Sequence, residues 1–408
     1  LAIGRELYKY DAVNIPVIVM DINPGTGSAA PTYMMTYNNK LYFQANSPAT
    51  GTELWVHDPV LNTTQCLSDI NPGANSSTIA FITEYNGKLY FAGSNGNDTT
   101  AGNTGLELYS YDPTINVVNL VADINPGYLP SNPTGLMVAN NKLYFVAAEP
   151  SYGKELYEFD GVNITRLTDV NPGPAQGIYT SDQAFPTWYN GCVYFCANEA
   201  NNDMNLGEYN TQTNTTNIIY CAGAGVSGLP SYFKVWDNKL FFANHSASSG
   251  TELWVKDSNN VPYQVWDINP GLPPGNPKFF TAFNGNLYFN AFNDTSTAEE
   301  LFRLYKRVDT IIITPNQITD LNKLINIHLS PNPVSSLLAI ELTTATATSI
   351  YCELIDITGR KLLQTGIQKV QTHRVETIDC TALPAGSYML LLKDSNHRVL
   401  RNEKVIKR

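Results

Sequence analysis

The sequence predicts an all-β protein of two domains, and three observations support this prediction. The phrase Asp-(Ile/Val)-Asn-Pro-Gly occurs five times, beginning at Asp21, Asp69, Asp123, Asp169 and Asp267. Short aromatic strands recur between the copies, and no helical periodicity accompanies them. From about residue 329 the repeat gives way to about seven short alternating strands in roughly 80 residues. We therefore expect a tandem repeat domain followed by a small Ig-like β-sandwich.

The repeat period favours a β-propeller. Successive phrases lie 48, 54 and 46 residues apart, and then 98 residues apart across a degenerate copy at Cys221–Gly225. A period near 50 with several short strands is typical of four-stranded propeller blades. First strands of this type begin near six positions: Pro31, Ile79, Pro133, Gln183, Ser231 and Lys278. We expect a six-bladed propeller over residues 1–305, with seven blades as the alternative.

The second repeat shows how each element follows from the residues. Ile79–Tyr85 and Lys88–Gly93 are apolar strands joined by Asn86-Gly87, a pair that accepts the positive φ of a tight hairpin. A third strand is expected over Glu107–Asp112, and a fourth ends at Asp123–Ile124. The Asn-Pro-Gly that follows ends strand pairing at its proline and turns at its glycine.

The N-terminus predicts ring closure. Glu6–Asp11 and Val17–Ile22 resemble third and fourth strands without a first and second. They are expected to complete the last blade, whose inner pair is Phe279–Phe283 and Leu287–Phe292. Glu300–Tyr305 also fits the third-strand pattern, so the sequence leaves open which of the two occupies that blade.

Acidic residues recur in pairs, because each third strand begins with Glu and each fourth strand ends with Asp. The pairs are Glu6 with Asp21, Glu53 with Asp69, Glu107 with Asp123, Glu155 with Asp169, and Glu252 with Asp267. Neighbouring antiparallel strands bring these ends together, and like charges there need compensation. One interpretation is a structural Ca²⁺ bridging the carboxylates and turn carbonyls. The favoured one is that Glu accepts backbone N–H bonds while Asp caps the turn.

The degenerate copy bears on the same pairs. Asn205 and Cys221 stand where the other repeats have Glu and Asp, so both acids are lost together. This joint loss indicates that the two acids of a pair act as a unit.

The repeat region resembles the bacterial ELWxxDGT repeat proteins. Gly51–Asp58, GTELWVHD, and Gly250–Asp257, GTELWVKD, carry the likeness, which covers about residues 1–305. The Gly-Thr that usually follows the Asp is mostly missing. That family is defined by sequence more than by activity, so the resemblance implies a surface protein and names no ligand.

The C-terminal segment, residues 329–408, resembles the type A C-terminal sorting domain of the Bacteroidota type IX secretion system. The matching residues are Pro331, Asn332 and Pro333, then Asp356, Gly359 and Arg360, then Leu383, Gly386 and Tyr388, and finally Lys404 and Lys407. The resemblance implies export to the outer cell surface or medium of a Gram-negative bacterium, and recognition by the translocon and its shuttle protein. It also implies removal by a sortase as the usual fate. The alternative is a carbohydrate-binding or adhesive sandwich. Residues 306–328 are expected to be a linker.

Composition limits the partners. Residues 330–408 hold ten Lys/Arg and seven Asp/Glu, a net charge of +3, which leaves −14 of the total −11 for the rest of the chain. An acidic repeat region argues against nucleic acid as a partner. No apolar run approaches the roughly 20 residues of a transmembrane helix.

Two kinds of covalent change are suggested. Cys352 and Cys380 lie on two predicted strands of the C-terminal domain, where they form either a disulfide or two buried thiols. Asp98-Thr99-Thr100 and Asp309-Thr310-Ile311 resemble the Bacteroidota O-glycosylation sequence, with Thr99 and Thr310 as acceptors.

No catalytic motif appears: the sequence has no nucleophile elbow, phosphate loop or His-x-x-x-His pair. We therefore expect a non-catalytic binding or structural module, adhesion-like, with an unidentified glycan or protein ligand. The alternative is an extracellular glycan-active or other hydrolase with its site at the propeller mouth. Fold alone does not decide between them.

Overall fold

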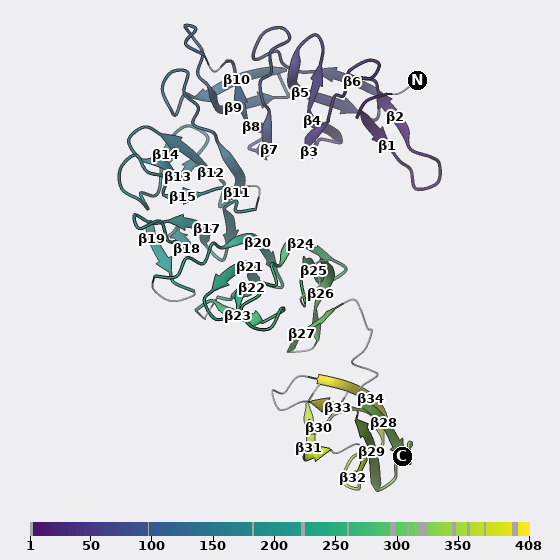
Figure 1. Ribbon diagram of the computed structural model, residues 1–408. Helices are drawn as coiled ribbons and strands as arrows, with labels where there is room; N and C mark the ends of the chain where they lie inside the picture. The colour runs from purple at the N-terminus through teal and green to yellow at the C-terminus, as the bar shows by residue number, and fades with distance from the viewer. Residues whose placement is uncertain are drawn as a thin grey trace. The chain divides into compact units, whose positions relative to one another are not determined.

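The computed structural model describes residues 3–96, 98–181, 183–221, 225–258, 261–293, 299–307, 310–315, 325–344, 348–356, 360–370, 373–393 and 399–408. All its regular elements are β-strands, joined into antiparallel sheets, which confirms the predicted all-β class. The chain divides into two compact units, residues 1–280 with 291–299, and residues 281–290 with 300–408. Figure 1 shows the strands in chain order.

Four-stranded sheets repeat along the first unit, each formed by consecutive strands in the order first, second, third, fourth. The first is β3 (Thr32–Tyr37), β4 (Lys40–Ser47), β5 (Gly51–Asp58) and β6 (Thr63–Cys66). The next is β7 (Ala80–Tyr85), β8 (Lys88–Ser94), β9 (Leu106–Asp112) and β10 (Val117–Ala122), followed by β11 (Thr134–Ala139), β12 (Lys142–Glu149), β13 (Gly153–Phe159) and β14 (Ile164–Arg166). The elements expected in the second repeat are thus confirmed to within one or two residues.

The later sheets follow the same plan with one addition. β15 (Ile178–Tyr179) and β16 (Thr187–Tyr189) both pair with β17 (Cys192–Asn198), which continues to β18 (Met204–Asn210) and β19 (Thr215–Ile219). Then come β20 (Ser231–Trp236), β21 (Lys239–Ser246), β22 (Gly250–Lys256) and β23 (Tyr263–Trp266), and finally β24 (Lys278–Phe283), β25 (Asn286–Ala291), β26 (Glu300–Arg307) and β27 (Thr310–Pro315). Of residues 306–328, which were expected as a linker, 306–307 therefore end β26, 310–315 form β27 and 325–328 begin the next strand, while 316–324 lie outside the described residues.

The same two-residue turn joins the first and second strands of all six sheets. Both turn residues have positive φ at Asn38-Asn39, Asn86-Gly87, Asn140-Asn141, Asn190-Gly191, Asp237-Asn238 and Asn284-Gly285. Asn, Asp and Gly tolerate this left-handed backbone best, and such turns match the twist of the flanking strands. The turn residues therefore set the register of each hairpin.

The strands β1 (Leu7–Lys9) and β2 (Val17–Met20) form a two-stranded sheet of their own. The expectation that they complete the last sheet is wrong for this structure, because β26 and β27 hold its third and fourth positions. The physical reason is local connection. β26 follows β25 within a few residues, whereas β1 would have to close a loop of more than 250 residues, and closure entropy grows with loop length.

Successive sheets of the first unit pack face to face. Buried residues of one sheet cluster with those of the next, as where Tyr90 and Leu108 meet Leu143, Phe145 and Tyr157. Equivalent clusters join the β3–β6 sheet to the β7–β10 sheet, and the β11–β14 sheet to the β15–β19 sheet. The paired aromatics of each second strand point to opposite faces, so they fill both of its boundaries.

The second unit ends in two sheets that share one core. One contains β28 (Ile325–Ser330), β29 (Leu337–Thr344) and β32 (His373–Asp379), and the other contains β31 (Lys361–Val370), β30 (Thr348–Ile355), β33 (Gly386–Lys393) and β34 (Val399–Lys407). Leu338, Ile340 and Leu342 of the first sheet pack with Leu354 and Leu390 of the second.

Leu108→Ala should lower the free energy of unfolding by about 2–5 kcal/mol, because Leu108 is fully buried and a cavity would remain between two sheets. Chemical denaturation of the full chain measures this. The matched control is Leu120→Ala on β10 of the same sheet, whose exposed side chain should cost about 0.5 kcal/mol or less. Equal losses for the two variants would contradict face-to-face packing.

Candidate functional site: the acidic turns and the C-terminal domain

The glutamates of the paired acids lie inside the protein, at the start of each third strand. Glu53, Glu107, Glu155 and Glu252 are fully buried, and Glu6 is almost so. The residue opposite on the second strand is small in three sheets, where Ala45, Gly93 and Ala147 face the glutamate. This leaves room for a carboxylate between the strand and the following turn.

Each buried carboxylate accepts a backbone N–H from the residue after the motif Asp. The donors are Ile22 to Glu6 at 2.9 Å, Ile70 to Glu53 at 3.2 Å, Ile124 to Glu107 at 2.9 Å, Val170 to Glu155 at 3.1 Å and Ile268 to Glu252 at 2.8 Å. Hydrogen bonds to a charged acceptor are stronger than neutral ones. The glutamate thus ties its strand to the turn that leaves the sheet.

A second set of donors comes from the end of the same loop, just before the next first strand. Ala29 N donates to Glu6 at 3.0 Å, Ser131 N to Glu107 at 2.7 Å and Gly275 N to Glu252 at 2.6 Å. Ser77 Oγ donates to Glu53 in the same place. In these four cases both ends of the loop are therefore bound to one carboxylate, whereas Glu155 accepts from Thr168 Oγ1 and Val170 N at the start of its loop.

The aspartates bind a different part of the turn. The backbone N–H of Gly25, Gly73, Gly127 and Gly271 donates to Asp21, Asp69, Asp123 and Asp267 at 3.1–3.5 Å. In the remaining turn, Asp169 Oδ2 instead lies 3.8 Å from Arg166 Nη1. The motif asparagine donates to a carbonyl five residues on, as Asn125 does to Pro130. These are the contacts that the hydrogen-bonding interpretation predicts.

These donors satisfy the glutamates without a cation. Among the residues that the structure describes, no group of three or more His, Cys, Asp and Glu side chains is arranged to hold a metal ion. A structural Ca²⁺ at the five pairs therefore stays a hypothesis from the sequence.

Burial raises the pKa of Glu107, Glu155 and Glu252 to about 7. The hydrogen bonds from the turn favour the ionised form and lower the pKa, but the effect of burial is larger. The pKa of Glu53 is raised for the same reason. The raised pKa values follow from burial and mark these carboxyl groups as shielded from solvent.

The degenerate repeat replaces the missing acid with one from a neighbouring loop. Asn205, at the glutamate position of β18, is buried and donates through Nδ2 to Glu199 at 3.0 Å. Tyr220 OH donates to the other oxygen of Glu199 at 2.8 Å. Sequence reasoning missed Glu199, and its only signal was the joint loss of the two repeat acids beside an unassigned acidic residue.

In the C-terminal domain the Pro-Asn-Pro entry holds the last strand. Asn332 Nδ2 donates to the Lys404 carbonyl at 2.7 Å, and Ile406 N donates to Asn332 Oδ1 at 2.8 Å. The backbones of Val334 and Ile406 bond directly after it. The Asn332 side chain thus binds β34 as a neighbouring strand would, linking motif residues 72 positions apart.

The other motif residues shape turns. Arg360 N and Nε donate to Asp356 at 3.0 and 3.2 Å, and Tyr388 OH donates to the Pro384 carbonyl at 2.7 Å. Leu383 packs against the core, and Lys407 is buried with its Nζ donating to the Arg408 carbonyl. Four further motif residues are exposed or half-buried, namely Pro331, Pro333, Gly386 and Lys404. Gly359 lies outside the described residues.

The remaining sequence candidates have separate outcomes. Cys352 and Cys380 are free thiols buried in the core, so they form no disulfide here. Cys352 lies on β30 and Cys380 directly follows β32, and these two strands belong to different sheets. Thr99 is exposed in the loop between β8 and β9, accessible as an acceptor residue must be. Thr310 opens β27, and its side chain lies outside the described set.

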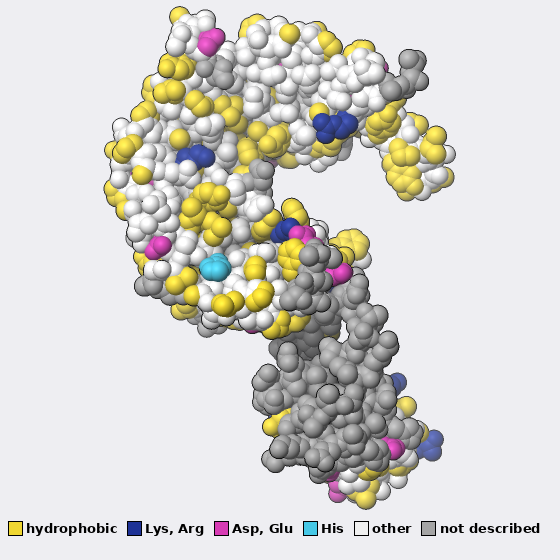
Figure 2. Space-filling view, viewed as in Figure 1, with side chains coloured by type: hydrophobic (Ala, Val, Ile, Leu, Met, Phe, Trp, Pro, Cys, Tyr) yellow, Lys and Arg dark blue, Asp and Glu magenta, His cyan; other side chains and the backbone are white. Residues whose placement is uncertain are grey.

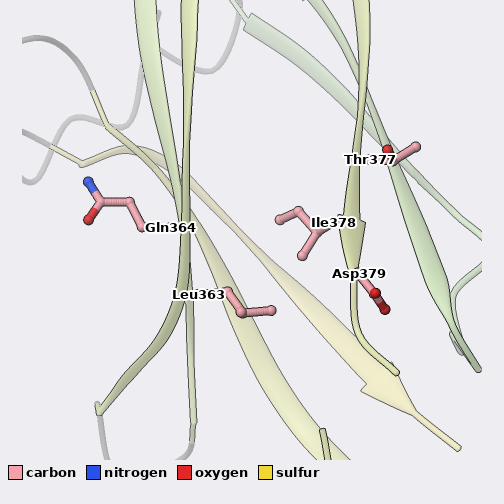
Figure 3. A pocket seen from close by; sticks show the side chains of 5 residues that line it. All are labelled: Leu363, Gln364, Thr377, Ile378 and Asp379. Carbon is pink, nitrogen blue, oxygen red and sulfur yellow. The ribbon is translucent and has the colours of Figure 1, made fainter. Parts of the chain in front are cut away.

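A small slot of about 200 Å³ lies between β31 and β32 of the C-terminal domain. Figure 3 shows Leu363 and Ile378 pointing into the space between these strands, while Gln364 points away. The slot is apolar and lies between edge strands of the two sheets.

Comparison with protein families identifies this domain. Residues 328–408 match the model of the secretion system C-terminal sorting domain. They form a type IX sorting domain. The sorting domain accounts for about a fifth of the chain, and it indicates export. A comparison with curated proteins found no match. The described part of the chain contains no helix that could span a lipid bilayer.

Solved structures resemble the chain only distantly. PorZ, an essential surface component of the type IX secretion system of Porphyromonas gingivalis, is 15% identical with a TM-score of 0.41, covering 92% of this chain and 51% of its own. TolB of Acinetobacter baumannii is 11% identical with a TM-score of 0.37, covering 69% and 64%. A prolyl endopeptidase is 9% identical with a TM-score of 0.45, covering 90% and 54%. The chain spans less than two thirds of each, and these similarities are too low to assign a function.

Glu107→Gln should lower the free energy of unfolding by about 1.5–3 kcal/mol, because an amide has one acceptor oxygen and turns its NH₂ toward the donors at Ile124 and Ser131. Urea denaturation measures the loss. The control is Glu84→Gln, whose carboxylate accepts only the more exposed Gly87 N–H, which water can satisfy. Equal effects of the two substitutions would refute the role of Glu107 in holding the turn.

Stability should fall as pH rises from about 4.5 to about 7. In that window the folded protein keeps protons on Glu107, Glu155 and Glu252 that the unfolded chain releases, so proton release favours unfolding. Above about 7 this dependence ends. Thermal melting from pH 4.5 to 8 measures it, and the triple Glu→Gln variant should show a flatter profile. An unchanged profile in that variant would assign the pH dependence to other groups.

Proposed function

We propose that this protein is an exported or surface-displayed cargo of the type IX secretion system, whose repeat domain is a non-catalytic binding and structural module. The sorting domain at residues 328–408 carries the export part of the proposal. The source would be a Gram-negative Bacteroidota bacterium, and the partners in export the translocon and its shuttle protein. We further propose that the repeat sheets form a six-bladed β-propeller and the sorting domain an Ig-like sandwich.

The buried acids support a structural role for the repeat domain. A carboxyl group with a pKa near 7 is the usual mark of a general acid or base. Glu107, Glu155 and Glu252, however, are fully buried, and their oxygens bind turn N–H groups. A substrate cannot reach them without opening the turn. The observation therefore favours a scaffold over the alternative hydrolase.

Removal of residues 329–408 should abolish export. The full chain and the truncated chain would be produced in a bacterium that has a type IX secretion system, and the protein would be quantified in periplasm, on the cell surface and in the medium. We expect at least tenfold less extracellular protein from the truncated chain, with accumulation in the periplasm.

A strain lacking the translocon is the control, and it should retain the full chain as well. Intact mass of the exported protein shows whether the sorting domain has been removed. Equal export of the full and truncated chains would contradict the proposed role of the C-terminal domain.

A further inference from the structure

Two loops of the first unit depart from the repeat pattern and line the same groove. In four of the loops the next first strand begins seven positions after the motif glycine, as Thr134 does after Gly127. After Gly173 the chain first pairs as β15 (Ile178–Tyr179) and then makes an extended loop of seven residues, 180–186, before β16 begins at Thr187. The following loop, after β19, is the degenerate copy without the Asp-Ile-Asn-Pro-Gly phrase. Loops that depart from a repeat are where such architectures place binding functions.

These two loops line the same groove. It has a volume of about 660 Å³, within the range usual for ligand sites. Tyr179, the last residue of β15, and Gln183 of the extended loop line it, and the degenerate loop contributes Ser227 and Leu229. The sheet of β20–β23 supplies further lining residues, including Tyr232 and His245.

Backbone hydrogen bonds fix the walls of the groove. Gly228 N donates to the Met204 carbonyl at 2.7 Å, and His245 N donates to the Gly228 carbonyl at 2.6 Å, which holds the degenerate loop against β18 and β21. A Cβ at Gly228 would lie 2.4 Å from Asn244 Oδ1, so any larger residue there would require the buried Asn244 side chain to move. Tyr232 N donates to the Gln183 carbonyl at 2.5 Å and joins the extended loop to β20.

The ring of Tyr232 is also fixed in place. It packs edge-on against the ring of Phe279, with centroids 5.4 Å apart and planes at 72°. The groove is therefore preformed on backbone contacts and needs little ordering to bind, which reduces the entropic cost of association.

The lining combines aromatic rings with neutral polar groups. Tyr179, Tyr232 and Phe292 give apolar surface, while Gln183, Ser227 and Asn276 give amide and hydroxyl groups. Amides and hydroxyls both donate and accept hydrogen bonds. A sugar needs this combination, because each of its hydroxyls donates and accepts while the C–H face of its ring is apolar.

The charge of the groove points to a neutral ligand. None of its described lining residues is Asp or Glu, and the cation Lys278 forms an ion pair with Glu299. Figure 2 shows few charged side chains on the visible face of the repeat sheets. A phosphorylated or strongly acidic ligand would find no cluster of unpaired cations among these residues.

We propose that this groove binds a neutral oligosaccharide, with Tyr179 and Tyr232 supplying ring surface and Gln183 supplying hydrogen bonds. This inference rests on the proposed function of the repeat domain as a binding module, and it gives that module a site and a ligand class.

The test is binding of the purified full chain to an array of neutral oligosaccharides, acidic oligosaccharides and peptides, with affinities then measured in solution. We expect binding to neutral oligosaccharides that Tyr179→Ala and Gln183→Ala each weaken at least tenfold. The Gln183 side chain is exposed and its carbonyl bond to Tyr232 survives the substitution, so this variant should fold. The control is Tyr128→Ala, an exposed tyrosine in the regular seven-residue loop before β11.

Each other outcome overturns part of the proposal. Neutral-sugar binding that the groove variants leave unchanged would place the site elsewhere. Binding confined to acidic glycans or peptides, or no binding, would reject the ligand class. Failure of export would reject the proposed secretion and leave this result intact, because the binding assay uses purified protein.

Discussion

The buried glutamate at the start of each third strand is the interaction on which the repeat domain depends. One carboxylate accepts N–H groups from both ends of the loop that connects two sheets, as Glu107 does from Ile124 and Ser131. A loop of seven or so residues between sheets would otherwise leave these donors buried without partners, at a cost of about 1–3 kcal/mol each. The carboxylate therefore fixes where each sheet begins relative to the one before it.

Packing between sheets follows from that placement. Once the connection is fixed, the two aromatics of each second strand face opposite boundaries, and Phe145 meets the preceding sheet while Tyr144 meets the following one. The pKa of the same carboxyl groups is raised because they are buried away from water. We therefore expect the residues that organise the fold to make its stability depend on pH near neutrality as well.

In the β15–β19 sheet this glutamate is missing, and we propose a different use for that part of the repeat domain. Asn205 removes the charge from β18, and Glu199 supplies another acid from outside the strand. The loop after β19 binds β18 and β21 through the backbone of Gly228 and through Ser227 Oγ, which accepts from Met204 N. Without the phrase to hold in place, that loop can present Ser227 and Leu229 to a groove. The regular loops are held by the glutamates, whereas the two irregular loops line the groove that we propose as a binding site. Export is assigned to a separate domain at the other end of the chain.

The sequence by itself determined the all-β class, the repeat and its hairpins, because Asn-Gly turns and alternating apolar residues are local signals read over a few positions. It also identified the sorting domain, whose motif residues stand in order. It predicted that Glu107 and Asp123 lie at adjacent strand ends, and the register pairs their chain neighbours Leu108 and Ala122. The same positive-φ turn is found at Asn38-Asn39 and Asp237-Asn238, although these pairs contain no glycine.

Only the tertiary structure decided how the acids are satisfied, which strands complete the last sheet, and where a groove forms. Donors to Glu107 come from 17 and 24 positions away, and Asn332 meets β34 across more than 70 residues, distances over which no sequence period operates. The choice of β26 over β1 depended on loop closure. The groove depended on two loops, those of Gln183 and Ser227, which lie 44 positions apart in the sequence and come together once their sheets have packed. Local pattern sets the elements, and long-range contacts select the arrangement that satisfies their buried polar groups.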